Sequence, residues 1–246
     1  FPYTTLFRSV SPRLGLIYRP VEPVSVYASY SVSALPASGD QFSNLTLTSA
    51  ALKPEAFTNL EVGVKWDLRP GLVLTAAAYQ LDRENSTSRD PFNPAVTLQT
   101  GAQRSRGLEL GLTGNLTPRW SVAGGLARQE AEVTEATLAA AAGQKVPLVP
   151  RSTASLWNRY QATPELGFGL GVIHQASAFA AIDNSVTLPG FTRVDAAIFY
   201  NLTPEVSLQL NVENLTDEGY FPTAHNNSNI SPGAPRTARL SVTARF

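Results

Sequence analysis

The sequence predicts an all-β fold in which antiparallel strands run up and down beside one another. Three observations predict this class. Apolar and polar residues alternate along many segments, which is the period-two pattern of a strand with two different faces. Short turns that contain proline alternate with long polar loops, and proline presets a turn while lacking the N–H that a sheet needs. The composition, with 17 glycines and 18 prolines among 246 residues, fits the same class.

The proline turns set the frame of the chain. We expect five of them, at residues 19–23, 67–71, 115–119, 162–165 and 201–205. Between them lie longer connections rich in Asn, Ser, Asp, Gly and Pro, at residues 35–58, 85–98, 135–150, 178–190 and 215–234. The alanine-rich run 134–142 has helical propensity, so a short helix is expected inside its loop.

Around these turns we expect eleven strands, each bounded by a turn on one side and a long loop on the other. In chain order they cover residues 11–19, 24–34, 58–68, 71–84, 98–115, 119–133, 151–161, 165–177, 191–201, 205–214 and 235–246.

The alternation is clear in individual strands. In the third, Leu60, Val62 and Val64 alternate with polar residues or glycine, and in the fifth Leu108 and Leu110 do the same. The eighth places apolar residues between glycines, and the last two alternate aliphatic with polar side chains: Leu166, Phe168, Leu170, Val172; Val206, Leu208, Leu210, Val212; Ala238, Leu240, Val242, Ala244 and Phe246.

Two architectures produce such strands. A soluble sandwich buries one face of each sheet, but its strands average only about 5–6 residues. An outer-membrane barrel has longer strands, with short turns at one end and long loops at the other. The observed lengths and loop pattern favour a transmembrane antiparallel up-and-down β-barrel.

The two faces of the strands agree with a barrel. The apolar face has aromatic residues near strand ends, as an interfacial girdle would, although Tyr and Trp are also common in strands: Tyr18, Trp66, Trp120, Tyr160 and Tyr200. The opposite face carries charges that suit a wet or plugged lumen: Glu61, Lys65, Asp67, Glu109, Arg193, Asp195, Glu213, Arg239 and Arg245.

Composition excludes several classes. The absence of cysteine removes disulfides, thiolate metal sites and cysteine nucleophiles. With 19 basic and 19 acidic residues the chain lacks the basic excess of a nucleic-acid binder. His174 and His225 have no metal-ligand spacing, and no catalytic constellation stands out. We therefore expect no enzyme and no cofactor.

Several features indicate a piece of a longer protein. The chain starts at Phe1 and has no methionine, and residues 1–9 resemble a non-native leader more than part of the barrel. Single-chain bacterial barrels have an even number of strands, whereas eleven is odd. Short turns are periplasmic in such barrels, so the last strand descends to end at Phe246. We expect 10–246 to be the C-terminal half of a barrel, lacking its upstream strands.

Five segments resemble TonB-dependent outer-membrane receptors, especially ferrichrome-type siderophore receptors. They lie in the order found in that family, each alone being a weak signal: LKPE followed by NLEVGVK at 52–65, RSRGLEL at 104–110, VPRSTASLW at 149–157, NVENLTDEGY at 211–220 and GAPRTARLSVTARF at 233–246.

The resemblance implies a barrel of about 22 strands, of which this chain is an incomplete barrel of about 11. It further implies a plug domain, a TonB box that contacts the inner-membrane energy complex, and uptake of a ferric siderophore without covalent chemistry. The ligand of such a protein is an iron–siderophore complex rather than a cofactor. Cobalamin or a glycan as substrate, or a small outer-membrane porin or barrel enzyme, are the alternatives.

Candidate functional residues follow from position. Phe246, a terminal aromatic on an alternating strand, resembles the signal read by the barrel-assembly machinery. Arg104 and Arg106 share the parity of Leu108 and could meet lipopolysaccharide phosphates, unless a bulge turns them inward. Loop aromatics are candidates for siderophore contact, with packing inside their own loops as the alternative: Tyr220, Phe221, Phe179, Phe92 and Phe57.

Overall fold

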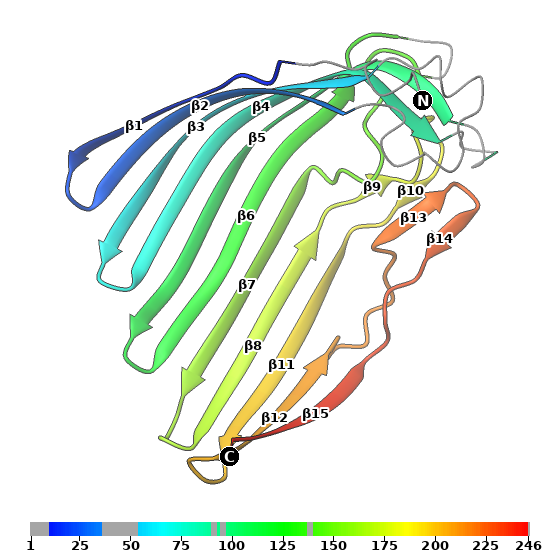
Figure 1. Ribbon diagram of the computed structural model, residues 1–246. Helices are drawn as coiled ribbons and strands as arrows, with labels where there is room; N and C mark the ends of the chain where they lie inside the picture. The colour runs from blue at the N-terminus through cyan, green and yellow to red at the C-terminus, as the bar shows by residue number, and fades with distance from the viewer. Residues whose placement is uncertain (1–9, 36–53, 90–92, 94–96, 137–139, 246) are drawn as a thin grey trace, which may run out of the picture.

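A computed structural model describes the chain apart from residues 1–9, 36–53, 90–92, 94–96, 137–139 and 246. Eleven strands form a single curved sheet (Figure 1) in which every neighbouring pair is antiparallel. In order across the sheet they are β1 (Arg13–Val21), β2 (Val24–Leu35), β3 (Glu55–Arg69), β4 (Leu72–Arg89), β5 (Thr97–Thr117), β6 (Trp120–Val133), β7 (Ser152–Gln161), β8 (Leu166–Gln175), β11 (Phe191–Asn201), β12 (Val206–Glu213) and β15 (Thr237–Ala244).

The predicted eleven-stranded up-and-down sheet is confirmed, with β1 and β15 at its two edges. All short turns lie at one end of the sheet and all long loops at the other (Figure 1). Among the described residues, no helix is long and apolar enough to cross a membrane.

The fourth and fifth strands are longer than predicted. β4 has 18 residues and β5 has 21, so much of the expected loop 85–98 is strand. The extension follows a register shift between Arg83 and Ser86, where Asn85 adopts a φ of 53°. Asparagine tolerates this left-handed conformation. The extension was missed because its polar sequence shows no alternation.

Two small hairpins inside the long loops were also missed. β9 (Ala178–Phe179) pairs with β10 (Thr187–Leu188), and β13 (Thr223–Asn226) pairs with β14 (Asn229–Ser231). The helix expected over 134–142 is absent from its described residues, 134–136 and 140–142. The chain there turns back toward β6 instead, with Val133 N–H donating to the carbonyl of Gln144.

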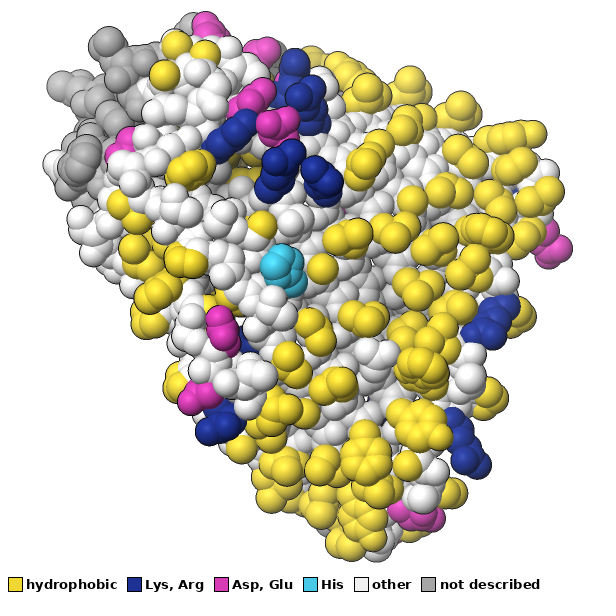
Figure 2. Space-filling view, turned by 180° about the vertical axis from the view of Figure 1, so that it is seen from behind, with side chains coloured by type: hydrophobic (Ala, Val, Ile, Leu, Met, Phe, Trp, Pro, Cys, Tyr) yellow, Lys and Arg dark blue, Asp and Glu magenta, His cyan; other side chains and the backbone are white. Residues whose placement is uncertain are grey.

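The strand register gives the sheet one apolar face. Leu110 lies between Ala76 and Leu126 in the ladder, and such rows continue from β1 to β15. Figure 2 shows this apolar band across the back of the sheet. The five predicted girdle aromatics share the parity of this face and lie near the short turns; Trp120, for example, is paired with Tyr160. A girdle at the membrane interface requires this placement.

The opposite face, which we call the lumenal face, is shaped by large side chains over glycines. The ring of Trp157 lies over Gly169 and Gly171, where an added Cβ would come within 2.5 Å of ring atoms. Arg159 stacks on Phe199 beside it, with 4.4 Å from the guanidinium carbon to the ring centroid. Gly169 and Gly171, which alternate with apolar residues in β8, make room for the indole of Trp157.

The small apolar cores of the described chain lie among the long loops rather than between layers. One contains Val133, Ala140 and Ile182, and another contains Ala180, Leu188 and Ala224. A sheet with one face toward lipid and the other toward a lumen has no packed interior of its own. The two clusters of buried apolar side chains are therefore found where the chain leaves the sheet.

We expect Gly171→Val to destabilise the full receptor by about 1–3 kcal/mol, because the new side chain must displace Trp157. The measurement is the urea midpoint of unfolding in detergent, followed by tryptophan fluorescence. Gly125→Val is the control: Gly125 also lies on the lumenal face, and the nearest atom to an added Cβ is 3.4 Å away. Equal midpoints for the two variants would contradict the packing role of Gly171.

Candidate functional site

A cluster of charges lies on the apolar face of the sheet, close to the long loops. This rim charge cluster consists of Asp82, Arg104, Arg106, Arg128, Glu130, Glu132 and Lys145. Figure 2 shows basic and acidic side chains gathered at this place, directly next to the apolar band. Four cations face three carboxylates, which leaves one net positive charge.

The two arginines predicted for lipid contact belong to this cluster. The ladder between β4 and β5 runs without a shift from Leu72 to Arg83, so Arg104 and Arg106 keep the parity of Leu108. The alternative in which a bulge turns them toward the lumen is therefore wrong. Their side chains are 43% and 61% exposed.

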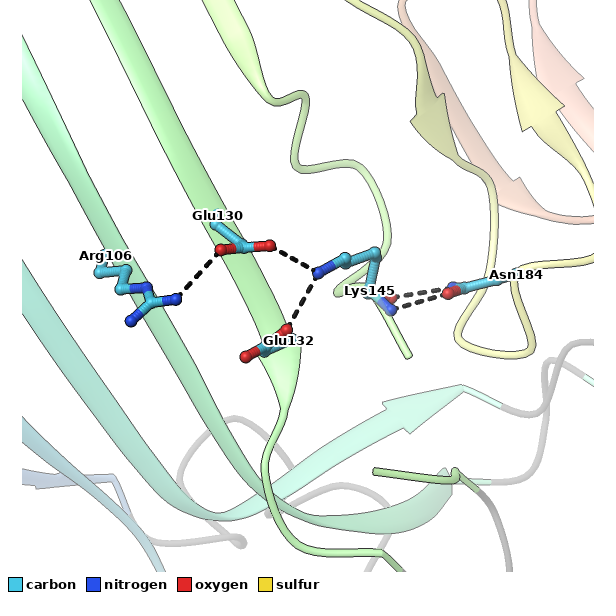
Figure 3. Close-up of polar contacts among 5 residues, drawn as sticks. All are labelled: Arg106, Glu130, Glu132, Lys145 and Asn184. Atoms are coloured by element: carbon cyan, nitrogen blue, oxygen red, sulfur yellow. Dashed lines mark hydrogen bonds and ion pairs between the residues drawn. The ribbon is translucent and has the colours of Figure 1, made fainter. Parts of the chain in front are cut away.

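Both arginines already have a carboxylate partner. Arg104 Nε lies 2.6 Å from Asp82 Oδ1, and Arg106 Nη2 lies 3.2 Å from Glu130 Oε2 (Figure 3 shows the second pair). Each guanidinium carries five N–H donors, so neither is saturated by these bonds.

Lys145 joins the cluster from the loop that follows β6. Its Nζ donates to Glu130 Oε1 and to Glu132 Oε2, each at 2.9 Å (Figure 3). The hydrogen bond to Glu130, and then the one to Glu132, raises the pKa of Lys145 above its usual value. The loop cation thus stays charged between two carboxylates that would otherwise repel each other.

Arg128 marks the border between charged and apolar surface. It lies opposite Leu108 in the ladder and forms no ion pair with any described residue. Below it is an apolar hollow of about 680 Å³ over the small side chains of β4. Its lining includes Val62, Val64, Ala76, Ala78, Leu108, Leu110 and Arg128.

The predicted ligand-contact aromatics do not form one site. Tyr220 is only 8% exposed, and its ring lies 4.5 Å from that of Phe191. Phe179 lies in the small strand β9, whereas Phe221 is 42% exposed. Phe92 lies outside the described residues. Phe57 is not a loop residue as predicted, because it belongs to β3 and packs against Arg83, with 5.5 Å from guanidinium carbon to ring centroid.

Tyr220 is part of an anchor for the last long loop. Arg193 donates to the Tyr220 hydroxyl at 3.1 Å and to Asp195 Oδ2 at 2.8 Å. Asp195 Oδ1 accepts the backbone N–H of Asn214 at 2.8 Å, and Asn214 is 1% exposed. These contacts join Tyr220 to β11, so they support a packing role for its ring, although the partners lie in the barrel wall rather than in its own loop.

The lumenal face has a polar hollow of about 380 Å³ between β2 and β5. Serines, an asparagine and two carboxylates share it with aromatic and aliphatic side chains: Ser31, Ser33, Phe57, Asn59, Glu61, Tyr79, Leu81 and Glu109. At its loop end Arg83 is paired with the nearly buried Glu55, with Nη2 at 2.7 Å from Oε2. The charged lumenal face predicted from the alternation is therefore present.

Metal binding by the protein finds no support. No group of three or more His, Cys, Asp or Glu residues in the described part of the chain is arranged to hold an ion. His174 lies on the apolar face with Nδ1 at 2.9 Å from Thr192 Oγ1, and His225 lies in β13.

Sequence reasoning missed three loop residues with many contacts: Asp183, Asn184 and Asn227. Asn184 is bonded to Lys145, 39 residues earlier, and Asn227 to Asp183, 44 residues earlier. Asn184 adopts a left-handed φ of 56°, a conformation that asparagine tolerates. The sequence alone, however, does not show that this residue adopts it.

Comparisons with known proteins assign the family. Residues 1–215 match the family model described as "TonB dependent receptor-like, beta-barrel". The chain belongs to this family.

Two relatives of this TonB-dependent receptor chain are named as siderophore receptors. It is 32% identical to the catecholate siderophore receptor Fiu of Escherichia coli K12 over 263 aligned positions, which cover 100% of this chain and 34% of Fiu. It is 30% identical to the probable TonB-dependent siderophore receptor PiuA of Acinetobacter baumannii, with 96% of this chain and 34% of PiuA covered. The chain thus spans about a third of the length of these relatives.

Solved structures agree. The closed form of the Escherichia coli Fiu receptor superposes with a TM-score of 0.80 at 30% identity, covering 95% of this chain and 34% of that one. The PiuA structure gives a TM-score of 0.83 at 29% identity, covering 95% and 35%. The sheet is therefore part of a TonB-dependent receptor barrel in the bacterial outer membrane. Members of this family are transporters rather than enzymes, as expected from the sequence.

Asp183 gives the loops a pH dependence. Burial opposes ionisation of its carboxyl group, but hydrogen bonds from Asn227 and Ser185 outweigh it, so the pKa lies below its usual value. A lowered carboxyl pKa stabilises the fold above the unfolded value of about 4, and the stabilisation is lost as the pH falls through the folded value.

We therefore expect loop 176–190 to become sensitive to pepsin only below about pH 4. In Asp183→Asn, cleavage at this loop should already occur at pH 5 and change little with further acidification. Ser207→Ala, on the lumenal face of β12, serves as the control. A wild-type loop that is cut equally at pH 5 and pH 3 would refute this role for Asp183.

Proposed function

We propose that the protein containing this chain imports a ferric siderophore across the outer membrane in a TonB-dependent manner. One observation carries the proposal: nearly the whole chain is about 30% identical to, and superposes on, the barrels of siderophore receptors. The polar lumenal face, with its hollow beside Glu61 and Glu109, supports a route for a hydrated or polar cargo.

The substrate class differs from the first expectation. The ferrichrome-type resemblance is not matched by the relatives, whose names are catecholate siderophore receptor for Fiu and metal-pseudopaline receptor for CntO of Pseudomonas aeruginosa. We therefore propose a catecholate-type ferric siderophore in place of ferrichrome. Cobalamin, glycan and porin functions have no comparable support.

The partners follow from the same family. We propose that a region upstream of this chain contacts TonB, and that the plug domain fills the lumenal face. We further propose residues 10–246 as the C-terminal half of the barrel, with 1–9 as a non-native leader.

Phe246 lies outside the described residues, and its role as the assembly signal stays a prediction. Deleting it should lower the amount of assembled receptor on a heat-modifiability gel. Of the ligand-contact candidates, Phe221 and Phe179 remain open to a siderophore.

The growth test is a receptor-deficient, iron-starved strain that carries the complete gene. We expect rescue by a ferric tris-catecholate and not by ferrichrome, and no rescue in a strain without TonB. A matched vector without the gene gives the background. Rescue by ferrichrome alone would overturn the catecholate assignment, and uptake that persists without TonB would overturn the transport proposal.

Lipopolysaccharide is the second proposed partner. The unpaired Arg128 above an apolar hollow favours a phosphate beside an acyl chain, with Arg104 and Arg106 as neighbouring donors. We expect Arg104→Ala/Arg106→Ala/Arg128→Ala to lower the lipopolysaccharide that copurifies with the receptor, measured by mass spectrometry. Arg159→Ala, on the lumenal face, should leave it unchanged, and equal amounts in both variants would exclude contact at the rim charge cluster.

A further inference from the structure

The segment 144–146 extends the sheet beside the upper end of β6. Val133 N–H donates to the carbonyl of Gln144 at 2.8 Å, and Val146 N–H donates to the carbonyl of Ala131 at 3.0 Å. Lys145 is bridged to Glu132 between these two bonds. In this antiparallel arrangement the N–H and C=O of Lys145 point away from β6.

The side chain of Asn184 satisfies both of these backbone groups. Its Oδ1 accepts the Lys145 N–H at 2.7 Å, and its Nδ2 donates to the Lys145 carbonyl at 2.9 Å (Figure 3). One amide thus takes the place of the next strand in the ladder. Loop 176–190 is thereby fastened to loop 134–151, which is itself fastened to β6.

The side chain of Lys145 adds a second link to the same strand. Its ammonium group lies between Glu130 and Glu132, at 2.9 Å from each (Figure 3). With the lysine 39% exposed, these ion pairs alone contribute little. They do link this loop to β6 through a side chain, at the same residue as the backbone contacts.

The last long loop is attached to the second. Asn227 Nδ2 lies 3.1 and 3.0 Å from the two carboxylate oxygens of Asp183 and donates to Ser185 Oγ at 2.9 Å. Apolar packing supports both junctions. Ile182 is fully buried with Val133 of β6, and Leu188 is packed with Ala224 of the last loop.

We propose that Lys145 and Asn184 are positioning residues that hold residues 140–151, 176–190 and 214–236 as one body on the barrel wall. The part of the extracellular vestibule that these loops form is then in place before a ligand arrives. Ligand binding then does not have to order these loops, because the conformational entropy of ordering them is already lost when the receptor folds. The expected benefit of the loop body for ligand affinity rests on the proposed function, whereas the existence of the loop body does not.

Hydrogen exchange of the full receptor in detergent, without ligand, tests the loop body. The variant is Asn184→Gly, because glycine keeps the left-handed conformation and removes only the amide. We expect exchange to rise on the order of tenfold in 144–146, in 176–190 and in 223–231, the factor for losing about 1.4 kcal/mol.

Asn229→Ala is the matched control, since Asn229 is an exposed asparagine of the same loops and forms no side-chain hydrogen bond with a described residue. It should leave exchange in 144–146 unchanged. Unchanged exchange in 176–190 of Asn184→Gly, or a rise confined to that loop, would overturn the single body.

Binding of a ferric tris-catecholate separates positioning from folding. We expect Asn184→Gly and Lys145→Met to raise its Kd about 2–10-fold while uptake at saturating chelate stays at the wild-type level, because only the fraction of competent loops changes. Lys145→Arg should restore the Kd. An unchanged Kd in both variants would overturn the positioning role. Failure of the wild-type receptor to bind the chelate would count against the proposed substrate, and the exchange result would still decide the loop body.

Discussion

The continuous backbone ladder is the constraint on which the rest of this structure depends. In the hydrocarbon of a membrane no water is available, so each N–H and C=O must find a partner in the protein. Eleven antiparallel strands meet this demand from one to the next, and the side chains are then free to serve two different surroundings. Along each strand, the apolar residues face lipid, and the polar residues that alternate with them face the lumen.

The backbone ladder also explains where glycines occur in the strands and where the clusters of buried apolar residues lie. The lumenal face has no second layer to pack against. Large aromatic rings lie over its glycines instead: Trp157 over Gly169 and Gly171, and Tyr27 over Gly63. In the described part of the chain, the two clusters of buried apolar residues lie among the loops, where Ile182 and Leu188 are fully or almost fully buried. Stability of the strands thus comes from pairing, and stability of the loops from small cores and amide hydrogen bonds.

The strands could be predicted from the sequence because each one is defined by residues that are close together in the chain. A period of two and a proline turn define a strand within about ten residues, so the eleven strands and their order could be predicted. For Arg104 and Arg106 the sequence left both faces open, and the unshifted register between β4 and β5 assigns them to the apolar face. The loop end of β4 was missed because, above the membrane, neither face has to be apolar and the alternation disappears.

The loop residues could not be predicted for a related reason. Their partners lie far away in the chain, as Asn184 and Lys145 do, and no periodicity connects them. Tyr220 shows the same difficulty in reverse. An aromatic residue in a long polar loop suggests ligand contact, but the ring is buried by Phe191 and its hydroxyl is bonded to Arg193.

Lys145 is the point at which the two kinds of structure meet. Its backbone extends the ladder of β6 for one more step, and its other edge is closed by an amide side chain because no further strand is there. The same residue places its charge between Glu130 and Glu132, at the border where the apolar band ends. A barrel wall built for lipid can therefore pass into a water-exposed loop body without leaving backbone groups unpaired. The proposed loop body depends on this junction, because the contacts of Lys145 attach it to β6.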